Sequence, residues 1–288
     1  MTRTPQGTPA ADALQGAITA ISAAGCETPR LDAEVLLASV LGVGRERLIT
    51  DRELTVAGPA VRAYQDAVRR RAVLREPVAY ITGRRAFRHL ELKADRRALV
   101  PRPETELLVE CGLRLPAGAA VLDLCTGSGA VALALKAERP DLRLTGSDIS
   151  EPALELAREN ARELGLDVSW VVADLLEGLP DEFDAVLVNP PYVAESERAS
   201  LAPEILRHEP PGALFAGPDG MAVIERLAAQ LGPRARVGTV AIEVGLGQAE
   251  RTAGLLSDAG FPGLRYEVDL AGITRVVVGE RKGYEHGS

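Results

Sequence analysis

Four consecutive residues, Asn189, Pro190, Pro191 and Tyr192, combine a side-chain amide, two prolines and an aromatic ring. They directly follow the apolar run at residues 183–188, which predicts a strand that ends at this segment. Because proline has no backbone N–H, the segment offers mainly hydrogen-bond acceptors beside a ring, and it suits a planar amide or amine. The same residues are also compatible with a proline-rich turn that only ends a strand.

The chemistry that fits this segment is methylation of a weakly nucleophilic planar nitrogen. The lone pair of an amide nitrogen is delocalised into its carbonyl, so attack on a methyl donor requires that the N–H bonds be held and aimed. We expect the side-chain oxygen of Asn189 and the carbonyl oxygen of Pro190 to accept one N–H each and to stabilise the charge that develops on nitrogen. Asn189 and Pro190 are then catalytic, and Asn189, Pro190, Pro191 and Tyr192 bind the substrate.

A second motif lies upstream, at residues 120–133. It reads Ala-Val-Leu-Asp-Leu-Cys-Thr-Gly-Ser-Gly-Ala-Val-Ala-Leu, which predicts a buried strand, a glycine turn and the start of a helix. Such a turn lets backbone amides approach a ligand closely at the carboxyl edge of a sheet. Asp148 ends a second predicted strand nineteen residues after Gly129, where its carboxylate can hold two ribose hydroxyls. Together these residues predict a nucleoside site.

Two cofactors are compatible with this site. Residues 127–132 fit the pattern G-x-G-x-x-A, which with an acidic residue about 20 positions on can be a dinucleotide fingerprint. S-adenosylmethionine explains more of the sequence, because Asp123 on the first strand is placed for the ammonium group of the donor and Asn189 follows the fourth strand. A dinucleotide site leaves the Asn-Pro-Pro-Tyr segment without a role. We therefore expect S-adenosyl-L-methionine, converted to S-adenosyl-L-homocysteine.

These motifs resemble those of a known family. Residues 123–133, Asp148 and residues 189–192 are similar to the class I S-adenosylmethionine-dependent methyltransferases that modify exocyclic or amide nitrogens. Within them the chain resembles the PrmC/HemK family of peptide chain release factor N5-glutamine methyltransferases. Further matching segments, which extend the resemblance over about residues 75–279, are 75–83, 99–106, 208–220 and 242–248.

The resemblance implies an α/β fold: a class I (Rossmann-like) seven-stranded methyltransferase sheet preceded by a small helical domain and a β-hairpin. It implies methylation of the side-chain N5 of the glutamine in the Gly-Gly-Gln motif of peptide chain release factors, with no metal, no membrane and no direct nucleic-acid contact. The donor-binding residues that we expect are Asp123, Cys125, Thr126, Gly127, Ser128, Gly129, Asp148, Asp174, Leu175 and Asn189.

The sequence departs from the family pattern at two positions. Cys125 stands where many relatives have the first glycine of the loop, and because cysteine is small we expect the backbone path to be kept. Leu175 stands where some relatives place an aromatic residue against the adenine, so adenine packing would be aliphatic here.

Three other functions are compatible with the same motifs. A glutamine methyltransferase for a ribosomal protein has the same active site and a different docking domain. A nucleic-acid adenine-N6 methyltransferase also fits, since an adenine amine suits an Asn-Pro-Pro-Tyr segment. A non-catalytic binding module keeps the fold without turnover, but the intact Asp123, Gly127, Gly129, Asp148 and Asn189 argue against it.

Hydrophobic periodicity organises the chain into domains. Three helical patterns near residues 10–24, 30–41 and 60–74 predict a helical domain, and a strand-like pattern between residues 80 and 99 predicts a hairpin. Strands then alternate with helices, which indicates a parallel sheet, and two final strands can form an antiparallel hairpin. The predicted domains are an N-terminal helical substrate-docking domain (1–83), a β-hairpin linker (84–100), the methyltransferase domain (101–280) and a flexible tail (281–288). The predicted strands are 119–124, 142–147, 168–172, 184–188, 237–244, 263–269 and 273–279.

Composition and charge agree with a reduced cytoplasmic enzyme. At 288 residues, with three cysteines that lack metal-ligand spacing and no apolar run of membrane length, the chain suits two soluble domains. A net charge of −8 argues against affinity that comes mainly from phosphates. Residues 1–84 nevertheless hold 11 arginines against nine acidic residues. A cluster within them forms either a solvated helix face or a docking patch: Arg69, Arg70, Arg71 and Arg75.

A few other residues attract attention. His89, His208 and His286 are scattered, so we expect no metal site, and Ser128 lacks the surroundings of a hydrolase nucleophile. For Glu209 we expect a structural bridging role. Phe87 belongs either to the core of the hairpin or to the substrate site.

Overall fold

The chain forms two structural units, and one of them is built from two separate stretches of sequence. The computed structural model describes residues 7–234 and 236–284. The first unit comprises residues 1–83 together with 202–208, and the second comprises residues 84–201 and 209–288. Nothing in the sequence had indicated that residues 202–208 would join the N-terminal helices. No helix in the described part of the chain is long and apolar enough to cross a membrane.

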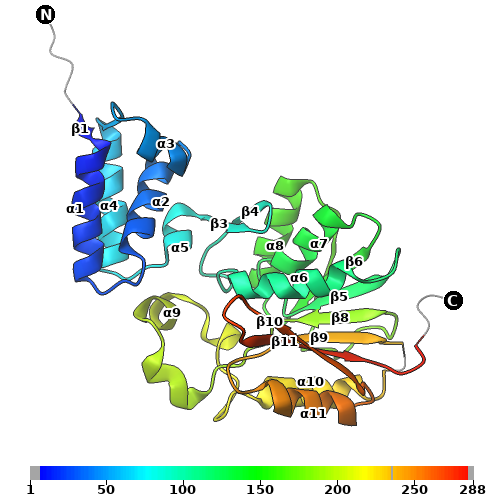
Figure 1. Cartoon of the computed structure of the whole chain (residues 1–288). Coiled ribbons are helices and arrows are strands. Elements are labelled where there is room, and N and C mark those ends of the chain that lie inside the picture. Colours follow the sequence, from blue (N-terminus) through cyan, green and yellow to red (C-terminus); the bar gives the residue numbers. More distant parts are fainter. Residues whose placement is uncertain (1–6, 235, 285–288) are drawn as a thin grey trace, which may run out of the picture. The chain divides into compact units, whose positions relative to one another are not determined.

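The first unit is a group of helices packed around an aliphatic core (Figure 1). Ile21, Leu36 and Leu37 are fully or almost fully buried at its centre, and the Tyr64 hydroxyl donates to the Ala33 carbonyl at 3.1 Å. The predicted helices are confirmed to within two residues. The elements of this unit are β1 (Thr8–Pro9), α1 (Ala10–Ala23), α2 (Pro29–Leu41), α3 (Arg45–Thr50), β2 (Thr55–Val56), α4 (Pro59–Ala72), α5 (Val78–Thr82) and α9 (Pro203–His208).

In the arginine cluster at the end of α4, Arg69 is exposed and pairs with Asp66, whereas the other three arginines are engaged in ion pairs within the first unit. Arg71 donates to Asp32 at 2.6 Å and to Glu204 of α9 at 3.0 Å, and Arg75 donates to Glu204 at 2.6 Å. The side chains of Arg71 and Arg75 are 6% and 12% exposed. Arg70 is also occupied, since it forms two hydrogen bonds with Glu76. These cations hold the first unit together internally, because a buried charge is stable only when it is paired.

The second unit contains a seven-stranded sheet with the order β10-β11-β9-β8-β5-β6-β7. The five strands β9, β8, β5, β6 and β7 run parallel, and β11 pairs antiparallel with both β9 and β10. This order confirms the predicted sheet and its final antiparallel hairpin. The strands are β5 (Ala120–Leu124), β6 (Arg143–Asp148), β7 (Ser169–Val172), β8 (Ala185–Val188), β9 (Thr239–Glu243), β10 (Gly263–Val268) and β11 (Thr274–Glu280).

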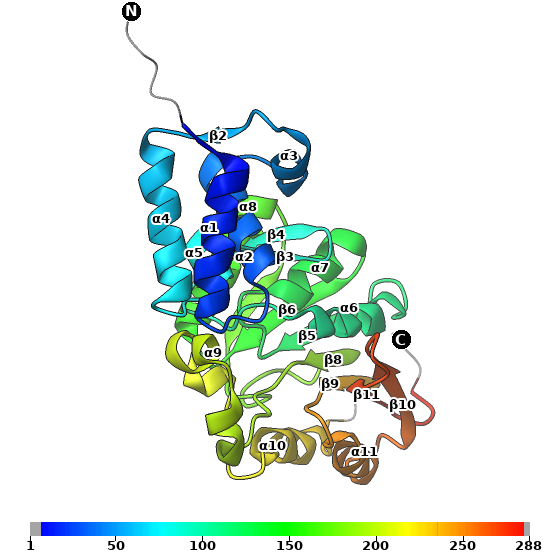
Figure 2. The ribbon, with the colours of Figure 1, turned by 60° about the vertical axis from the view of Figure 1, so that its left-hand side comes forward.

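Helices cover both faces of this sheet, as Figures 1 and 2 show from two directions. On one face lie α6 (Glu106–Leu113), α7 (Ala130–Glu138) and α8 (Glu151–Leu164), and on the other lie α10 (Ala222–Leu231) and α11 (Ala249–Asp258). The central strands send alternate residues into two cores: Val121 and Leu187 pack beneath α6 and α7, whereas Leu122 and Val186 pack against α10 and α11. Strands buried on both faces read as continuous apolar runs, which is how they were recognised.

A hairpin precedes the sheet and belongs to the second unit. Its strands, β3 (Arg84–Phe87) and β4 (Leu90–Lys93), pair antiparallel as predicted. Phe87 is 2% exposed and lies in the core with the residues of α6 and α7, so its position is structural. The short helices that complete the unit are η1 (Pro103–Thr105), η2 (Glu195–Ser200) and η3 (Pro211–Ala213).

Part of the segment predicted as a flexible tail contacts the sheet. The Arg281 guanidinium donates to the Val237 carbonyl at 3.1 Å, and the Tyr284 hydroxyl donates to Asp184 at 2.8 Å. The remaining residues of that predicted tail, 285–288, lie outside the described residues.

Candidate active site

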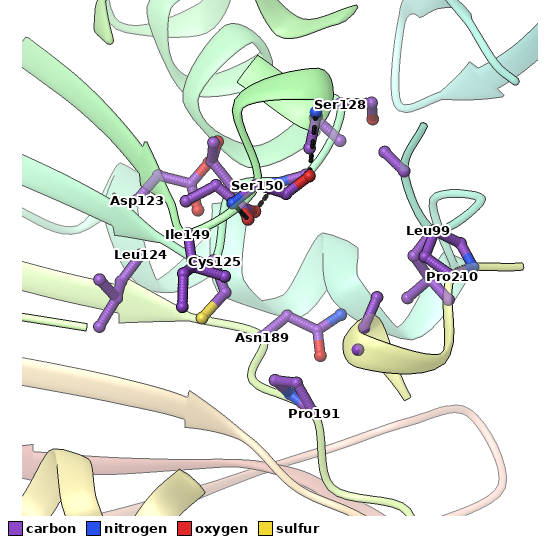
Figure 3. A pocket seen from close by; sticks show the side chains of 18 of the residues that line it. Leu99, Asp123, Leu124, Cys125, Ser128, Ile149, Ser150, Asn189, Pro191 and Pro210 are labelled. Atoms are coloured by element: carbon purple, nitrogen blue, oxygen red, sulfur yellow. Dashed lines mark hydrogen bonds between the residues drawn. The ribbon is translucent and has the colours of Figure 1, made fainter. Parts of the chain in front are cut away.

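A cavity of about 370 Å³ lies within the second unit, where β5, β6 and β8 end. Since β8, β5 and β6 are parallel neighbours, their carboxyl ends meet at one edge of the sheet. This edge brings together Asp123 on β5, Asp148 at the end of β6 and Asn189 directly after β8. Figure 3 shows Asn189 and Pro191 along one side of the cavity, with Asp123 and Cys125 at one end and Leu99 and Pro210 at the other.

The turn between β5 and α7 has a backbone that few residues adopt. Cys125, Gly127 and Gly129 all have left-handed φ values, of 56°, 56° and 84°. A side chain at Gly129 would also collide with Trp170, because a Cβ there would lie 2.9 Å from its ring. Cys125 therefore keeps the path of a glycine, as expected, although the left-handed region is unfavourable for a residue with a side chain.

Asp148 is positioned by the turn that it faces. Its Oδ2 accepts the Gly127 N–H at 2.9 Å, and its Oδ1 accepts the Ser150 N–H at 2.9 Å. Burial raises its pKa, and these backbone donors partly offset the increase. Each carboxylate oxygen has further acceptor capacity, so Asp148 can still receive two hydroxyl groups of a ligand.

Asp123 is a carboxyl group that is almost completely buried at the end of the cavity. It is 2% exposed, and its Oδ2 accepts the Thr126 hydroxyl at 2.5 Å and the Ala132 N–H at 3.0 Å. Burial raises its pKa to about 7, against the lowering effect of these two donors. A buried carboxyl of this kind gains from a cationic partner, which would favour its charged form.

Asn189 stands on the other side of the cavity with its carboxamide oriented by a neighbour. Its Nδ2 donates to the Thr105 hydroxyl oxygen at 3.1 Å, so Oδ1 is the atom left for a ligand N–H. Thr105 is 5% exposed and sits where η1 passes into α6. Thr105 belongs to the segment 99–106 that matches the family pattern, but no role was predicted for it.

The predicted site residues do not all line this cavity. Those that do are Asp123, Cys125, Thr126, Gly127, Ser128, Asp148, Asp174, Leu175, Asn189 and Pro191. Gly129 and Pro190 are buried, and neither lines the cavity. Tyr192 lines a separate hollow of about 430 Å³ instead, and its hydroxyl donates to Glu243 at 3.3 Å.

Several residues at the cavity were not anticipated. Arg226 of α10 lines it and pairs with Asp174 at 2.7 Å. Glu209, for which a bridging role was expected, accepts the Val100 N–H at 3.2 Å and Arg102 at 2.6 Å. The Arg226–Asp174 pair joins segments that are 52 residues apart, so no local pattern could have indicated it. Among the described residues, no group of three or more His, Cys, Asp or Glu side chains could hold a metal ion.

Known proteins resemble this chain over most of its length. Residues 103–226 match the model of the methyltransferase small domain, and residues 12–83 match that of the PrmC N-terminal domain. The release factor glutamine methyltransferase of Rhodospirillum rubrum is 38% identical over 91% of this chain and 82% of that protein. The protein of the same name from Deinococcus radiodurans is 38% identical over 94% of this chain and 98% of its own length.

The fold is also found in solved structures. A methyltransferase from Pyrococcus furiosus superposes with a TM-score of 0.52 and 16% identity, covering 68% of this chain and 91% of that one. This likeness concerns the fold alone. The identity to whole curated proteins is the stronger finding, because it runs through both units. The chain therefore belongs to the family of release factor glutamine methyltransferases.

Proposed function

We propose that this protein transfers a methyl group from S-adenosylmethionine to the side-chain amide nitrogen of the glutamine in the Gly-Gly-Gln motif of peptide chain release factors. The observation that carries the proposal is the place of Asn189. Its carboxamide lies at the same sheet edge as Asp123 and Asp148, with Nδ2 bound to Thr105 and Oδ1 left for a substrate. A cytoplasmic location follows from this proposal, because release factors act on ribosomes there.

The cavity suits the proposed donor in size and in polarity. Its volume of about 370 Å³ is within the usual range for a small-molecule site. Asp148 can accept two ribose hydroxyls, and Asp123 can accept an ammonium group. Ile149, which directly follows Asp148, is 67% exposed although it lines the cavity, and an apolar side chain left open there suits the face of an aromatic base.

The donor supplies a methyl group bound to a positively charged sulfur. The residues of the chain have to aim the substrate nitrogen at that methyl group and to receive its N–H bonds. Asn189 Oδ1 accepts one N–H, and the Pro190 carbonyl is the proposed second acceptor. An acceptor dipole that is in place before the reaction lowers the barrier without reorganising. In the overall reaction an N–C bond replaces an N–H bond and the S–C bond to the transferred methyl group breaks, so S-adenosylhomocysteine and a proton are released.

Mass spectrometry tests this function directly. The purified protein would be incubated with isotopically labelled donor and, in parallel, with release factor, ribosomes or DNA. We expect the label in the glutamine of the Gly-Gly-Gln motif, and labelling about 10²–10³ times slower when Asn189→Ala replaces the wild type at equal concentration. Label in a ribosomal protein or in adenine, with none in release factor, would refute the proposed substrate.

A further inference from the structure

A buried carboxyl group lies behind the proposed substrate site. Glu243, the last residue of β9, is 1% exposed. Its Oε1 accepts the Tyr192 hydroxyl at 3.3 Å, while its Oε2 is buried without a hydrogen-bond partner. The Thr105 hydroxyl acts on this carboxyl as a hydrogen-bond donor and thereby lowers its pKa. Thr105 therefore stands between Glu243 and Asn189.

The direction of these hydrogen bonds depends on Glu243. A hydroxyl group has one proton to donate, and an ionised carboxylate can only accept. When Glu243 is ionised, Thr105 gives its proton to the carboxylate and must accept from its other neighbour, Asn189. Nδ2 of Asn189 is then bound to Thr105, which is the arrangement in the structure. A protonated Glu243 can instead donate to Thr105, which can then donate to Oδ1 and turn the carboxamide around.

We propose that Glu243 is a positioning residue, which through Thr105 keeps the side-chain oxygen of Asn189 directed at the amide of the substrate. The inference rests on the proposed function, because it assigns Oδ1 the task of holding a substrate N–H. Tyr192 contributes in the same way, since its hydroxyl also donates to this carboxylate. Reversing the carboxamide would present an NH₂ group to the N–H of the substrate, where two donors repel.

The surroundings of Glu243 set the pH at which this orientation is stable. Burial raises its pKa to about 7, and the nearby Glu104 acts in the same direction. Thr105, Tyr192 and, from β11, Arg275 lower it. Because the pKa is raised, the carboxyl is protonated below about pH 7 and ionised above it. The orientation described here thus belongs to neutral and alkaline pH.

The composition of the chain makes this orientation measurable. Only two asparagines occur in the sequence, Asn160 and Asn189. Protein labelled with ¹⁵N in asparagine side chains therefore gives two NH₂ signals, and Asn160, which donates to the Ser128 carbonyl at 3.0 Å, is an internal reference. We expect the Asn189 signal alone to shift between pH 6 and pH 8, and the shift to disappear in Thr105→Val.

Kinetics at saturating donor and saturating release factor provide the second measurement. Thr105→Val keeps the size of the side chain but removes the hydroxyl, and we expect kcat to fall at least about tenfold, the scale for misplacing one polar contact to the transition state. Thr105→Ser should recover the larger part of that loss. The matched control is Thr252→Val, because Thr252 is fully buried on α11 and its hydroxyl has no hydrogen-bond partner. Below pH 7, kcat should fall in the wild type, and this decline should vanish in Glu243→Gln.

Each outcome decides one question. If Thr105→Val keeps the wild-type Asn189 signal and the wild-type kcat, the positioning role is refuted, whatever the substrate. If the wild type leaves release factor unmethylated, the proposed function fails, and the Asn189 signal still decides whether Glu243 and Thr105 orient the carboxamide. Unfolding of Glu243→Gln would not affect this decision, because the Thr105 variants retain the carboxylate.

Discussion

In the proposed mechanism, methyl transfer to an amide depends on a carboxamide, Asn189, rather than on a base. We expect Asn189→Ala to lower turnover by about 10²–10³, the usual cost of losing one preorganised contact to the transition state. Affinity for the donor, measured by calorimetry, should change by less than about twofold. Asn189→Asp is the informative partner variant, because a carboxylate still accepts an N–H but adds charge. Wild-type turnover in Asn189→Ala would contradict the mechanism.

Asp148 has two tasks, and the choice of substitution has to separate them. It holds the N–H groups of Gly127 and Ser150 and is the proposed acceptor for the ribose hydroxyls. Asp148→Ala would release the turn as well, so Asp148→Asn, which keeps one acceptor oxygen, is the better variant. We expect the donor Kd to rise by about 10–100-fold, the scale for charge-assisted hydrogen bonds. The exposed Asp258→Asn is the control. If calorimetry gave Asp148→Asn the same donor Kd as this control and the wild type, Asp148 would not belong to the donor site.

Binding of the donor should depend on pH through Asp123. The pKa of this carboxyl is raised to about 7, so it is mostly neutral at pH 6 and mostly ionised at pH 7.5. A cationic ammonium group binds the ionised form, and an α-amino group stays largely protonated in this range. We therefore expect affinity to increase by up to about tenfold from pH 6 to pH 7.5, with release of a proton on binding. The variant Asp123→Asn should bind weakly and without this pH dependence.

Sequence reasoning located those site residues that follow a local rule. Asp123, Asp148 and Asn189 each come at the end of an apolar run, and parallel strands bring their ends to one edge. Thr105 obeys no such rule, because it meets Asn189 across 84 residues of chain. Glu243 does end an apolar strand, β9, but the end of a strand alone does not indicate a contact with Thr105. Contacts of this kind depend on how helices pack on the sheet, which a single sequence does not encode in any short motif.

At the scale of single elements, the position of helix α9 depends on the ion pairs that its residue Glu204 forms. Glu204 on this six-residue helix accepts both Arg71 and Arg75, and all three side chains are at most 15% exposed. We expect Glu204→Ala to destabilise the first unit by about 3 kcal/mol, because it leaves buried guanidinium groups without this partner. Hydrogen exchange measured in urea on peptides from α2 and α4 would report the stability of the first unit separately from that of the second.

The control for this variant is an exposed pair in the second unit. Glu195 binds Arg198 at 2.9 Å, with both side chains about half exposed, so Glu195→Ala should change stability by no more than about 1 kcal/mol. If Glu204→Ala were equally mild, the buried ion pairs would contribute little to the placement of α9.

Hydrophobic periodicity predicted the long helices and the strands of the large sheet, but it did not predict several of the shortest elements. The sheet strands and the helices of ten residues or more repeat their apolar residues often enough to be recognised. By contrast, α3 and α5 have six and five residues, and β1 and β2 have two each, which is too short for a period to show. At the turn between β5 and α7, Cys125 has a left-handed φ of 56°, and only the neighbouring glycines indicated that bend.

For the whole molecule, the open question is which unit recognises the protein substrate. We predict that intact release factor, bound in the presence of S-adenosylhomocysteine, protects amides of the first unit from hydrogen exchange, whereas a short Gly-Gly-Gln peptide protects only the second. Remote contacts of this kind strengthen binding without changing the chemical step. Protection confined to residues 84–201 and 209–288 would show that the helical unit is not a docking element.

The division of the first unit between two stretches of sequence also affects how the protein is made. Arg71 and Glu204 are 133 residues apart, so the ribosome has completed all of α1 to α5 long before Glu204 exists. At a synthesis rate of about 5–20 residues per second, the delay is on the order of ten seconds. During that time Arg75 has no Glu204, and Arg71 has only Asp32 as its carboxylate partner. The N-terminal helices are therefore translated first, but they reach their final packing only after most of the catalytic sheet has been synthesised.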